Sequence, residues 1–174
     1  IYHKNIYAER NPGVVQELGD VGNDIQIYGN KLYAIINCSH FVEVMNVETA
    51  KHITQISIPN CRYIVFKDKY AYVSSYAGPV KIDPNARLGY VARVDTTTLT
   101  VKDTCVVGYQ PEEMVIVGNK LYVANSGGYR VPNYDRTVSV IDLNTFKVIK
   151  TIDVGINLHR MELDQYGNIY VSSR

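Results

Sequence analysis

The sequence repeats itself in units of about 40–50 residues, and this feature restricts the fold more than any other. The motif Gly29–Tyr33 returns as Gly118–Tyr122, in a shortened form as Gly167–Tyr170, and more loosely as Asp68–Tyr72. The tyrosines that end these motifs follow one another at spacings of 39, 50 and 48 residues. Such a period predicts an array of similar structural units.

A second element follows each of the first three motifs in the same order. It is a short apolar stretch that ends in Asp or Asn, with Thr three residues later. The three copies are Val42–Thr49, Tyr90–Thr98 and Val138–Thr145. Asp, Asn and Thr can hydrogen-bond nearby backbone groups, so we expect a turn at each of these places.

Each unit divides into four short strands. In the best-defined unit they cover Glu113–Val117, Lys120–Asn125, Thr137–Asp142 and Lys147–Val154, with apolar and polar residues alternating and turn residues between the strands. Stacked solenoids have shorter repeats as a rule, and a β-sandwich does not repeat its sequence. The sequence therefore predicts an all-β fold, a β-propeller of four-stranded antiparallel blades.

The repeat boundaries divide the chain into about three and a half blades of one propeller domain. The expected units are 1–23 (the end of a preceding blade and a linker), 24–60, 61–107, 108–155 and 156–174 (the first half of a further blade). Propellers typically close with about 4–8 blades, and an open ring exposes strand edges. We therefore expect either a larger ring of which this is a part or a homodimer that closes one.

The third unit carries a resemblance to a known family. Leu121–Ser126, Thr137–Asp142 and Val148–Gly155 resemble the YVTN-type repeat of surface-layer-like propellers in the quinoprotein amine dehydrogenase-like superfamily. From Gly19 to Arg174 the chain is similar to extracytoplasmic propeller lipoproteins of Bacteroidetes. The resemblance implies a ring of about seven blades in the periplasm or at the cell surface, with any lipid anchor in a segment outside this chain.

Charge and motif content exclude several function classes. The net charge is +1, which gives no electrostatic reason to expect a nucleic-acid partner. No apolar run reaches the ~20 residues of a transmembrane segment. The sequence lacks a phosphate-binding loop, a GxSxG or HExxH motif and the Trp residues that quinoprotein cofactors need. We expect no cofactor and no metal.

The starts of the first strands supply one group of candidate ligand-binding residues. Aligning the units on Ile25, Ile64, Met114 and Met161 gives two equivalent positions, occupied by Asn23, Arg62, Glu112 and His159 and then by Asp24, Tyr63, Glu113 and Arg160. The first strand of a blade is innermost, so these side chains should surround the mouth of the central channel. Their mixed donors and acceptors suit a polyhydroxylated ligand, a carboxylate or a peptide. Alternatively, they form salt bridges between blades.

Two long loops on the same face supply the second group. They are Ser75–Leu88 and Ser126–Arg136, whereas the same loop in the first unit covers only Ser39–Phe41. The candidate binding residues in them are Tyr76, Arg87, Tyr129, Arg130, Tyr134 and Arg136. Enlarged loops on one face often carry function. Alternatively, they cover the neighbouring blades.

The three cysteines do not form a metal-binding pattern, since no CxxC pair is present. Cys38 follows the second strand of its unit, and Cys61 begins the first strand of the next unit on the same face. A Cys38–Cys61 disulfide would join adjacent blades and contribute about 3 kcal/mol in the chain-entropy model. We expect Cys105, in an outer strand, to pack as a small buried side chain.

These features favour a non-enzymatic binding or scaffold propeller that recognises a glycan, peptide or protein partner at its channel-mouth face. A metal-assisted, lactonase-like hydrolase or lyase that uses the polar groups of the mouth is the alternative. A purely structural module of a surface assembly is the third.

Overall fold

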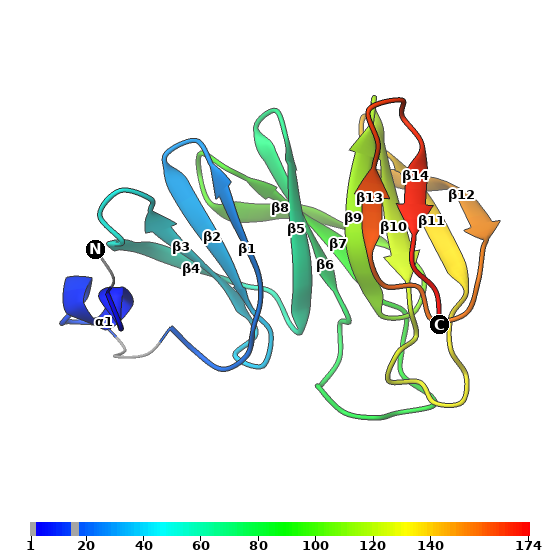
Figure 1. The fold of residues 1–174 in the computed structure, drawn as a ribbon, viewed down its shortest axis with the longest axis horizontal. Coiled ribbons are helices and arrows are strands. Elements are labelled where there is room, and N and C mark those ends of the chain that lie inside the picture. Colours follow the sequence, from blue (N-terminus) through cyan, green and yellow to red (C-terminus); the bar gives the residue numbers. More distant parts are fainter. Residues whose placement is uncertain (1–2, 15–17) are drawn as a thin grey trace.

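The computed structural model describes residues 3–14 and 18–174 and contains three four-stranded antiparallel sheets and one two-stranded sheet (Figure 1). The first blade consists of β1 (Gly22–Tyr28), β2 (Lys31–Ile36), β3 (Phe41–Asn46) and β4 (His52–Ser57). The second blade consists of β5 (Cys61–Lys67), β6 (Tyr70–Ser75), β7 (Tyr90–Asp95) and β8 (Thr100–Val106). The third blade consists of β9 (Pro111–Val117), β10 (Lys120–Asn125), β11 (Thr137–Asp142) and β12 (Lys147–Asp153). The fourth blade consists of β13 (Met161–Leu163) and β14 (Ile169–Val171).

The blades stand side by side as a fan, and the predicted fold class is confirmed (Figure 1). Within each four-stranded sheet every strand pairs with its neighbours in sequence. The first strands of consecutive blades contact one another, β1 with β5, β5 with β9, and β9 with β13. The first strands are therefore innermost, which is the arrangement of a propeller.

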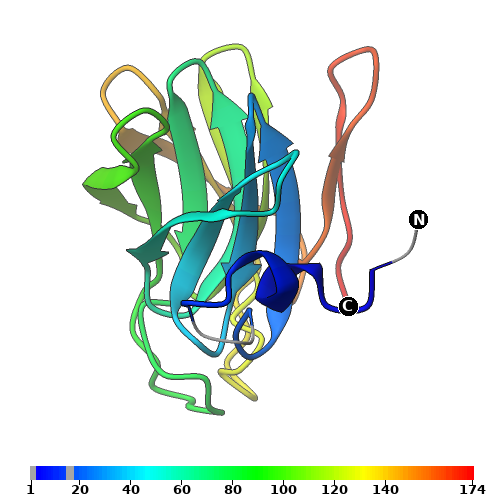
Figure 2. The same cartoon turned by 90° about the vertical axis from the view of Figure 1, so that its left-hand side faces the viewer.

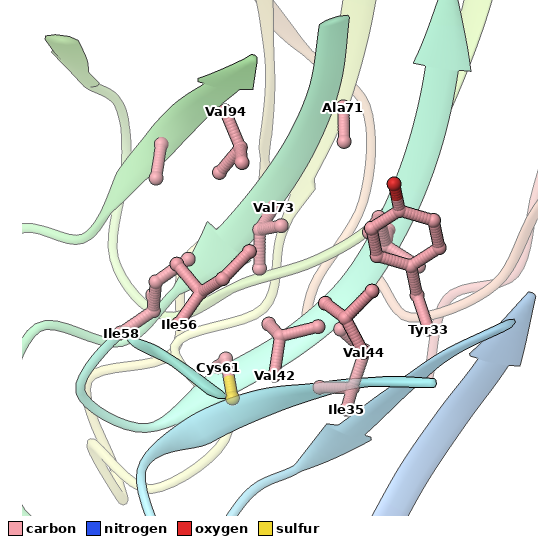
Figure 3. Close-up of a cluster of buried hydrophobic side chains, with 12 residues drawn as sticks. Tyr33, Ile35, Val42, Val44, Ile56, Ile58, Cys61, Ala71, Val73 and Val94 are labelled. Atoms are coloured by element: carbon pink, nitrogen blue, oxygen red, sulfur yellow. The ribbon is translucent and has the colours of Figure 1, made fainter. Parts of the chain in front are cut away.

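The apolar core lies between the blades. One cluster brings Val42 and Val44 of β3 against Val73 of β6 (Figure 3), and all three side chains are at most 1% exposed. Further clusters join the second blade to the third and the third blade to the fourth. Burying each such side chain contributes about 1.5–3 kcal/mol, so the contact between blades is a main source of stability.

The predicted turns are confirmed. The Oδ1 atoms of Asn46, Asp95 and Asp142 each accept hydrogen bonds from the backbone N–H groups two and three residues later, at 2.9–3.1 Å. Each side chain thereby caps the end of the third strand and directs the chain into the fourth. The repeated Asp/Asn and Thr of the sequence are thus explained by local geometry.

The N-terminal segment, predicted as the end of a preceding blade and a linker, contains a short helix. Residues 3–14 and 18–21 contain the short helix α1 (Ile6–Arg10) and no strand. Figure 2 shows α1 lying against the sheet of the first blade. Asn11 holds it there, because its Nδ2 donates to the carbonyl of Ala50 at 2.9 Å and its Oδ1 accepts from the amide of His52 at 2.7 Å. Long-range hydrogen bonds stabilise this segment, which is too short for a helical period to show in the sequence.

A buried carboxylate lies beneath α1. Glu43 of β3 is 0% exposed, accepts a hydrogen bond from the hydroxyl of Tyr7 at 3.2 Å, and lies 2.6 Å from Nδ1 of His52. Within the described residues its second oxygen, Oε2, has no hydrogen-bond partner. Burial and the nearby Glu43 carboxylate raise the pKa of Tyr7 to about 12, so its phenol stays protonated.

The predicted Cys38–Cys61 disulfide is not formed, since both thiols are free. Cys61 is completely buried in the first apolar cluster (Figure 3), with its Sγ 3.4 Å from the carbonyl oxygen of Phe41. The Sγ of Cys38 instead lies 3.6 Å from Oδ1 of Asn37. Burial raises the pKa of Cys61 to about 12, which keeps the thiol protonated and unreactive. Cys105 is also buried, as predicted.

Candidate functional site

The side chains aligned at the start of each first strand lie on a repeated backbone irregularity. In β1, β5 and β9 one extra residue interrupts the pairing with the second strand. The extra residue falls between Gly22 and Asp24, between Cys61 and Ile64, and between Pro111 and Met114. A β-bulge redirects the side chains that it carries, so these positions project from the inner strands at one end of the propeller.

Glu112 occupies the centre of this region. Its side chain is only 4% exposed, and its Oε2 accepts a hydrogen bond from Nε of Arg62 at 3.1 Å. Its Oε1 accepts one from the Tyr76 hydroxyl and one from Oγ of Ser126 at 3.4 Å. A buried carboxylate needs such partners, since an unpaired buried charge is costly. Arg62 and Glu112 therefore join the second blade to the third.

The aromatic ring of Tyr76 completes this buried pair. The guanidinium carbon of Arg62 lies 4.7 Å from the ring centroid. Burial and the Glu112 carboxylate hold the pKa of Tyr76 well above its ordinary value, so the hydroxyl remains a donor. Burial lowers the pKa of Arg62, but the carboxylate more than offsets this, and the pKa lies above its usual value. Tyr129, from the other long loop, packs edge-on against Tyr76 with ring centroids 5.8 Å apart.

His159 stands at the edge of the same cluster. Its Nε2 lies 3.9 Å from Oε2 of Glu112, beyond hydrogen-bonding distance, and its side chain is 45% exposed. Its ring meets that of Tyr63 edge-on at 6.0 Å. Since Arg62 holds the same carboxylate oxygen more closely, the geometry does not position His159 and Glu112 as a tightly coupled acid–base pair.

The second aligned position forms contacts between blades. Oε2 of Glu113 accepts the backbone N–H of Met161 at 2.7 Å, and its Oε1 pairs with Nη1 of Arg160 at 3.1 Å. In the same way, Oδ2 of Asp24 accepts the N–H of Ile64 at 3.1 Å. The acid of one blade thus holds the first strand of the next. A ligand-binding role for this position stays a prediction.

The two long loops are bound to each other. The backbone N–H of Asp83 donates to the carbonyl of Tyr129 at 2.8 Å. Nδ2 of Asn133 lies 3.5 Å from the carbonyl oxygen of Pro84, at the limit for a hydrogen bond. The amide of Tyr129 also donates to Oε1 of Gln110 at 2.5 Å. The loops therefore form one connected surface, which Tyr76 joins to Glu112.

The remaining loop candidates lie apart from the Glu112 cluster. The guanidinium of Arg130 stacks 3.5 Å from the ring centroid of Tyr109. Tyr134 accepts a hydrogen bond from Arg174 at 3.2 Å. Arg136 pairs with Asp153 at 2.9 Å, and both side chains are more than half exposed. The structure thus brings together Arg62, Glu112, His159, Tyr76 and Tyr129, but not Arg130, Tyr134 or Arg136.

A pocket of about 540 Å³ lies between the long loop of the second blade and the short loop of the first. It is lined among others by His40, Pro59, Tyr76, Lys81, Arg87 and Gln110. Arg87 also lines a second hollow of about 430 Å³. Of these lining residues, Tyr76 and Arg87 are among the candidates predicted from the sequence, and His40, Lys81 and Gln110 are not. Lys81 lies within the long loop, which was a usable signal, but no sequence feature indicated His40.

Two further findings concern chemistry and membranes. Within residues 3–14 and 18–174 no group of three or more His, Cys, Asp or Glu side chains is arranged to hold a metal ion. In the same part of the chain no helix is long and apolar enough to cross a membrane.

The model of a family described as Domain of unknown function (DUF5074) matches residues 1–174. The chain belongs to this family. A search of curated proteins finds no match to this DUF5074 sequence.

Solved structures similar to the DUF5074 chain are β-propellers. Hydrazine synthase of Kuenenia stuttgartiensis matches with a TM-score of 0.69 and 21% identity, over 82% of this chain and 40% of that one. The WD40 β-propeller domain of Doa1 matches with a TM-score of 0.67 and 16% identity, over 86% and 47%. AztD of Citrobacter koseri matches with a TM-score of 0.53 and 16% identity, over 76% and 33%. The chain spans less than half the length of each, and these identities show the fold alone.

Proposed function

We propose that this chain is a non-enzymatic binding propeller that recognises a glycan, peptide or protein partner on its long-loop face. The observation that carries the proposal is the pocket of about 540 Å³ between the first and second blades. Concave sites of this size with a few polar groups are typical of ligand binding. The long loop that forms one wall is tied to the neighbouring blade through Asp83 and Tyr129, so the wall is held in position before a ligand arrives.

The channel mouth supports this placement indirectly. Arg62 and Glu112 use their hydrogen-bonding groups on each other, on Tyr76 and on Ser126. In our proposal Arg62 and Glu112 have a structural role beneath the long loops, and the residues that line the pocket contact the ligand. The same partners favour a binding role over a catalytic one, because a carboxylate that already accepts hydrogen bonds from three donors is poorly placed to take a proton.

We also propose that the chain is a YVTN-type repeat protein that works on the extracytoplasmic side. The resemblance of Leu121–Ser126, Thr137–Asp142 and Val148–Gly155 to that repeat supports this assignment. The propeller fold of the similar structures is consistent with it but carries no information on location.

The test is to block the pocket and measure binding. The chain has no Trp, so one introduced Trp both fills the space and reports on it by fluorescence. Ala86→Trp places the ring in the pocket wall, whereas Ile82→Trp is the matched control, because Ile82 is 72% exposed on the same loop and outside the pocket lining. Both variants and the parent chain are applied to glycan and peptide arrays.

We expect binding by the parent and by Ile82→Trp, and its loss in Ala86→Trp at an unchanged melting temperature. Equal binding by Ala86→Trp and Ile82→Trp would contradict the assignment of the pocket. If the parent chain bound nothing on the glycan array and nothing on the peptide array, this result would contradict the binding function itself.

A further inference from the structure

The polar groups of the pocket are mostly hydrogen-bond donors. Lys81 and Arg87 are cationic, and Gln110 has a side-chain amide whose Oε1 is already used by the Tyr129 N–H. Asp83 is the single acidic side chain among the residues that line the pocket in the described part of the chain. The lining therefore carries an excess of positive charge and of N–H groups, which favours an anionic ligand group.

His40 adds a donor whose position is fixed. Its Nδ1 accepts a hydrogen bond from the backbone N–H of Asn60 at 2.9 Å. A neutral imidazole that accepts at Nδ1 carries its proton on Nε2, so Nε2–H is left as a donor. The backbone of His40 has φ of 63°, and it sits in the tight turn between β2 and β3. Backbone geometry thus holds this side chain at the rim of the pocket.

Arg87 is anchored but retains most of its donors. Its Nη2 donates to the carbonyl of Ala77, which also lines the pocket. A guanidinium has five N–H groups, and this bond is the one that the described structure gives it. Anchoring by one group reduces the side-chain freedom lost when the others bind a ligand.

The acidic side chain is partly satisfied within its own loop. Oδ1 of Asp83 accepts the N–H of Asn85 at 2.9 Å, and its Oδ2 lies 3.7 Å from Nζ of Lys81. Lys81 is 62% exposed, so this ion pair is weak and its ammonium remains able to approach a ligand. Asp83 can still accept hydrogen bonds from hydroxyl groups. Charged donors beside an acceptor match a molecule that carries both a carboxylate and hydroxyls.

We propose, building on the binding function above, that the pocket binds an acidic sugar with its carboxylate facing Arg87 and His40. The hydroxyls of the sugar ring would face Asp83 and Gln110, while Pro59 and Pro79 form the apolar walls. The shared chemistry is a uronate, either as a free acid or at the end of a glycan chain.

The test is calorimetric titration of the full chain with matched probes. D-glucuronate and D-galacturonate are compared with D-glucose and with the methyl ester of glucuronic acid, which removes the charge and keeps the ring. A digalacturonate distinguishes a chain end from a free acid. The variants are Arg87→Gln and, as the matched control, Arg10→Gln in helix α1, where the side chain is exposed and outside the pocket lining.

We expect a uronate to bind at least roughly tenfold more tightly than glucose or the methyl ester, since hydrogen bonds to a charged group are the stronger ones. Arg87→Gln should remove this preference, and Arg10→Gln should retain it. Tighter binding of digalacturonate than of the single uronates would assign the site to chain ends, and equal binding would assign it to the free acid.

Equal binding of uronate and glucose that Ala86→Trp abolishes would overturn the acidic-sugar assignment and leave the binding function standing. A preference for acetyl-Ala-Ala with a free carboxylate over both uronates would also overturn it. Failure of every probe to bind, together with array binding unaffected by Ala86→Trp, would overturn both proposals.

Discussion

Glu112 shows how a single residue can have a structural role at a place where a ligand-binding role was predicted. Its carboxylate is almost fully buried and is shared by Arg62, Tyr76 and Ser126, which come from two blades. The bulge that precedes Met114 turns it into this position. The contribution of Glu112 to stability therefore depends on these partners, because a buried carboxylate without them would be strongly destabilising.

Arg62→Ala is expected to lower the free energy of unfolding by about 3–5 kcal/mol, since it leaves the buried Glu112 unpaired. Arg136→Ala is the control, because Arg136 pairs with Asp153 in solvent and its loss should cost less than about 1 kcal/mol. Urea unfolding of both variants measures the difference. The double variant Arg62→Met with Glu112→Gln should regain stability, and equal losses in the two single variants would refute this role of the pair.

The sequence places Arg62 and Glu112 near each other, but it does not indicate the other partners of the carboxylate. Aligning the repeats places Arg62 and Glu112 at the same level of adjacent blades, which is enough to bring them near each other. The Tyr76 hydroxyl reaches Glu112 only because of the path that the long loop takes. His40 joins the pocket for a similar reason, since a turn of one blade meets a loop of the next.

At the level of elements, the turn between the third and fourth strands has the same hydrogen-bonding geometry in all three complete blades. The first blade uses Asn46, whereas the second and third use Asp95 and Asp142 in the same geometry. The N–H groups of Thr98 and Thr145 contribute most to lowering the pKa of these two carboxyls below the ordinary 3.8. An amide side chain at the same place does not titrate.

The difference between Asn46 and the two aspartates predicts that this turn responds to acid in the second and third blades but not in the first. A lowered pKa means that the ionised form favours the folded state, so this contribution is present above about pH 4 and is lost as the pH falls through the folded-state pKa. We expect the amide resonances of Thr98 and Thr145 to shift with midpoints below 3.8, and that of Thr49 to show no such transition. Two-dimensional NMR between neutral and acidic pH measures this, and midpoints above 3.8 for Thr98 and Thr145 would be inconsistent with the turn.

Strands and helix also differ in how well the sequence predicts them. Apolar and polar residues alternate along Thr137–Asp142, and the same pattern recurs in the other units. The strands are predictable because the two-residue period and the repeat are separate signals for the same element. Helix α1 has five residues and is held by Asn11 through contacts with Ala50 and His52. Nothing local in the sequence indicates those contacts, so a tertiary interaction determines the element.

At the scale of the whole molecule, stability depends on groups that stay protonated inside the blades. Burial raises the pKa of Cys61 to about 12, and burial together with Tyr28 raises that of Tyr33 to about 12. Tyr7, beside Glu43, also reaches about 12. A raised pKa means that the neutral form favours the folded state. The stabilisation is complete below the unfolded-state values near 9 and 10 and is lost as the pH rises toward 12.

We therefore expect alkaline unfolding to coincide with ionisation of the buried tyrosines. The chain has 15 Tyr and no Trp, so tyrosinate absorbance reports on all of them without interference. The buried Tyr7 and Tyr33 should ionise only as the sheet signal in circular dichroism is lost. Tyr33→Phe removes a buried hydroxyl that has no partner in the described structure and should move unfolding to higher pH. A single titration near 10 with the sheet intact would contradict this prediction.

The buried Glu43 has a consequence for how such a chain can evolve. At the matching place on the third strand the other complete blades carry Ala92, which packs in the apolar cluster between the first two blades, and Ser139, whose Oγ accepts a hydrogen bond from Asn125. Glu43 fits instead beneath α1, where Tyr7 and His52 receive its carboxylate. If recombination moved the first blade between two other blades, the Glu43 carboxylate would be buried against aliphatic side chains. The order of the blades is therefore constrained, although their sequences are similar.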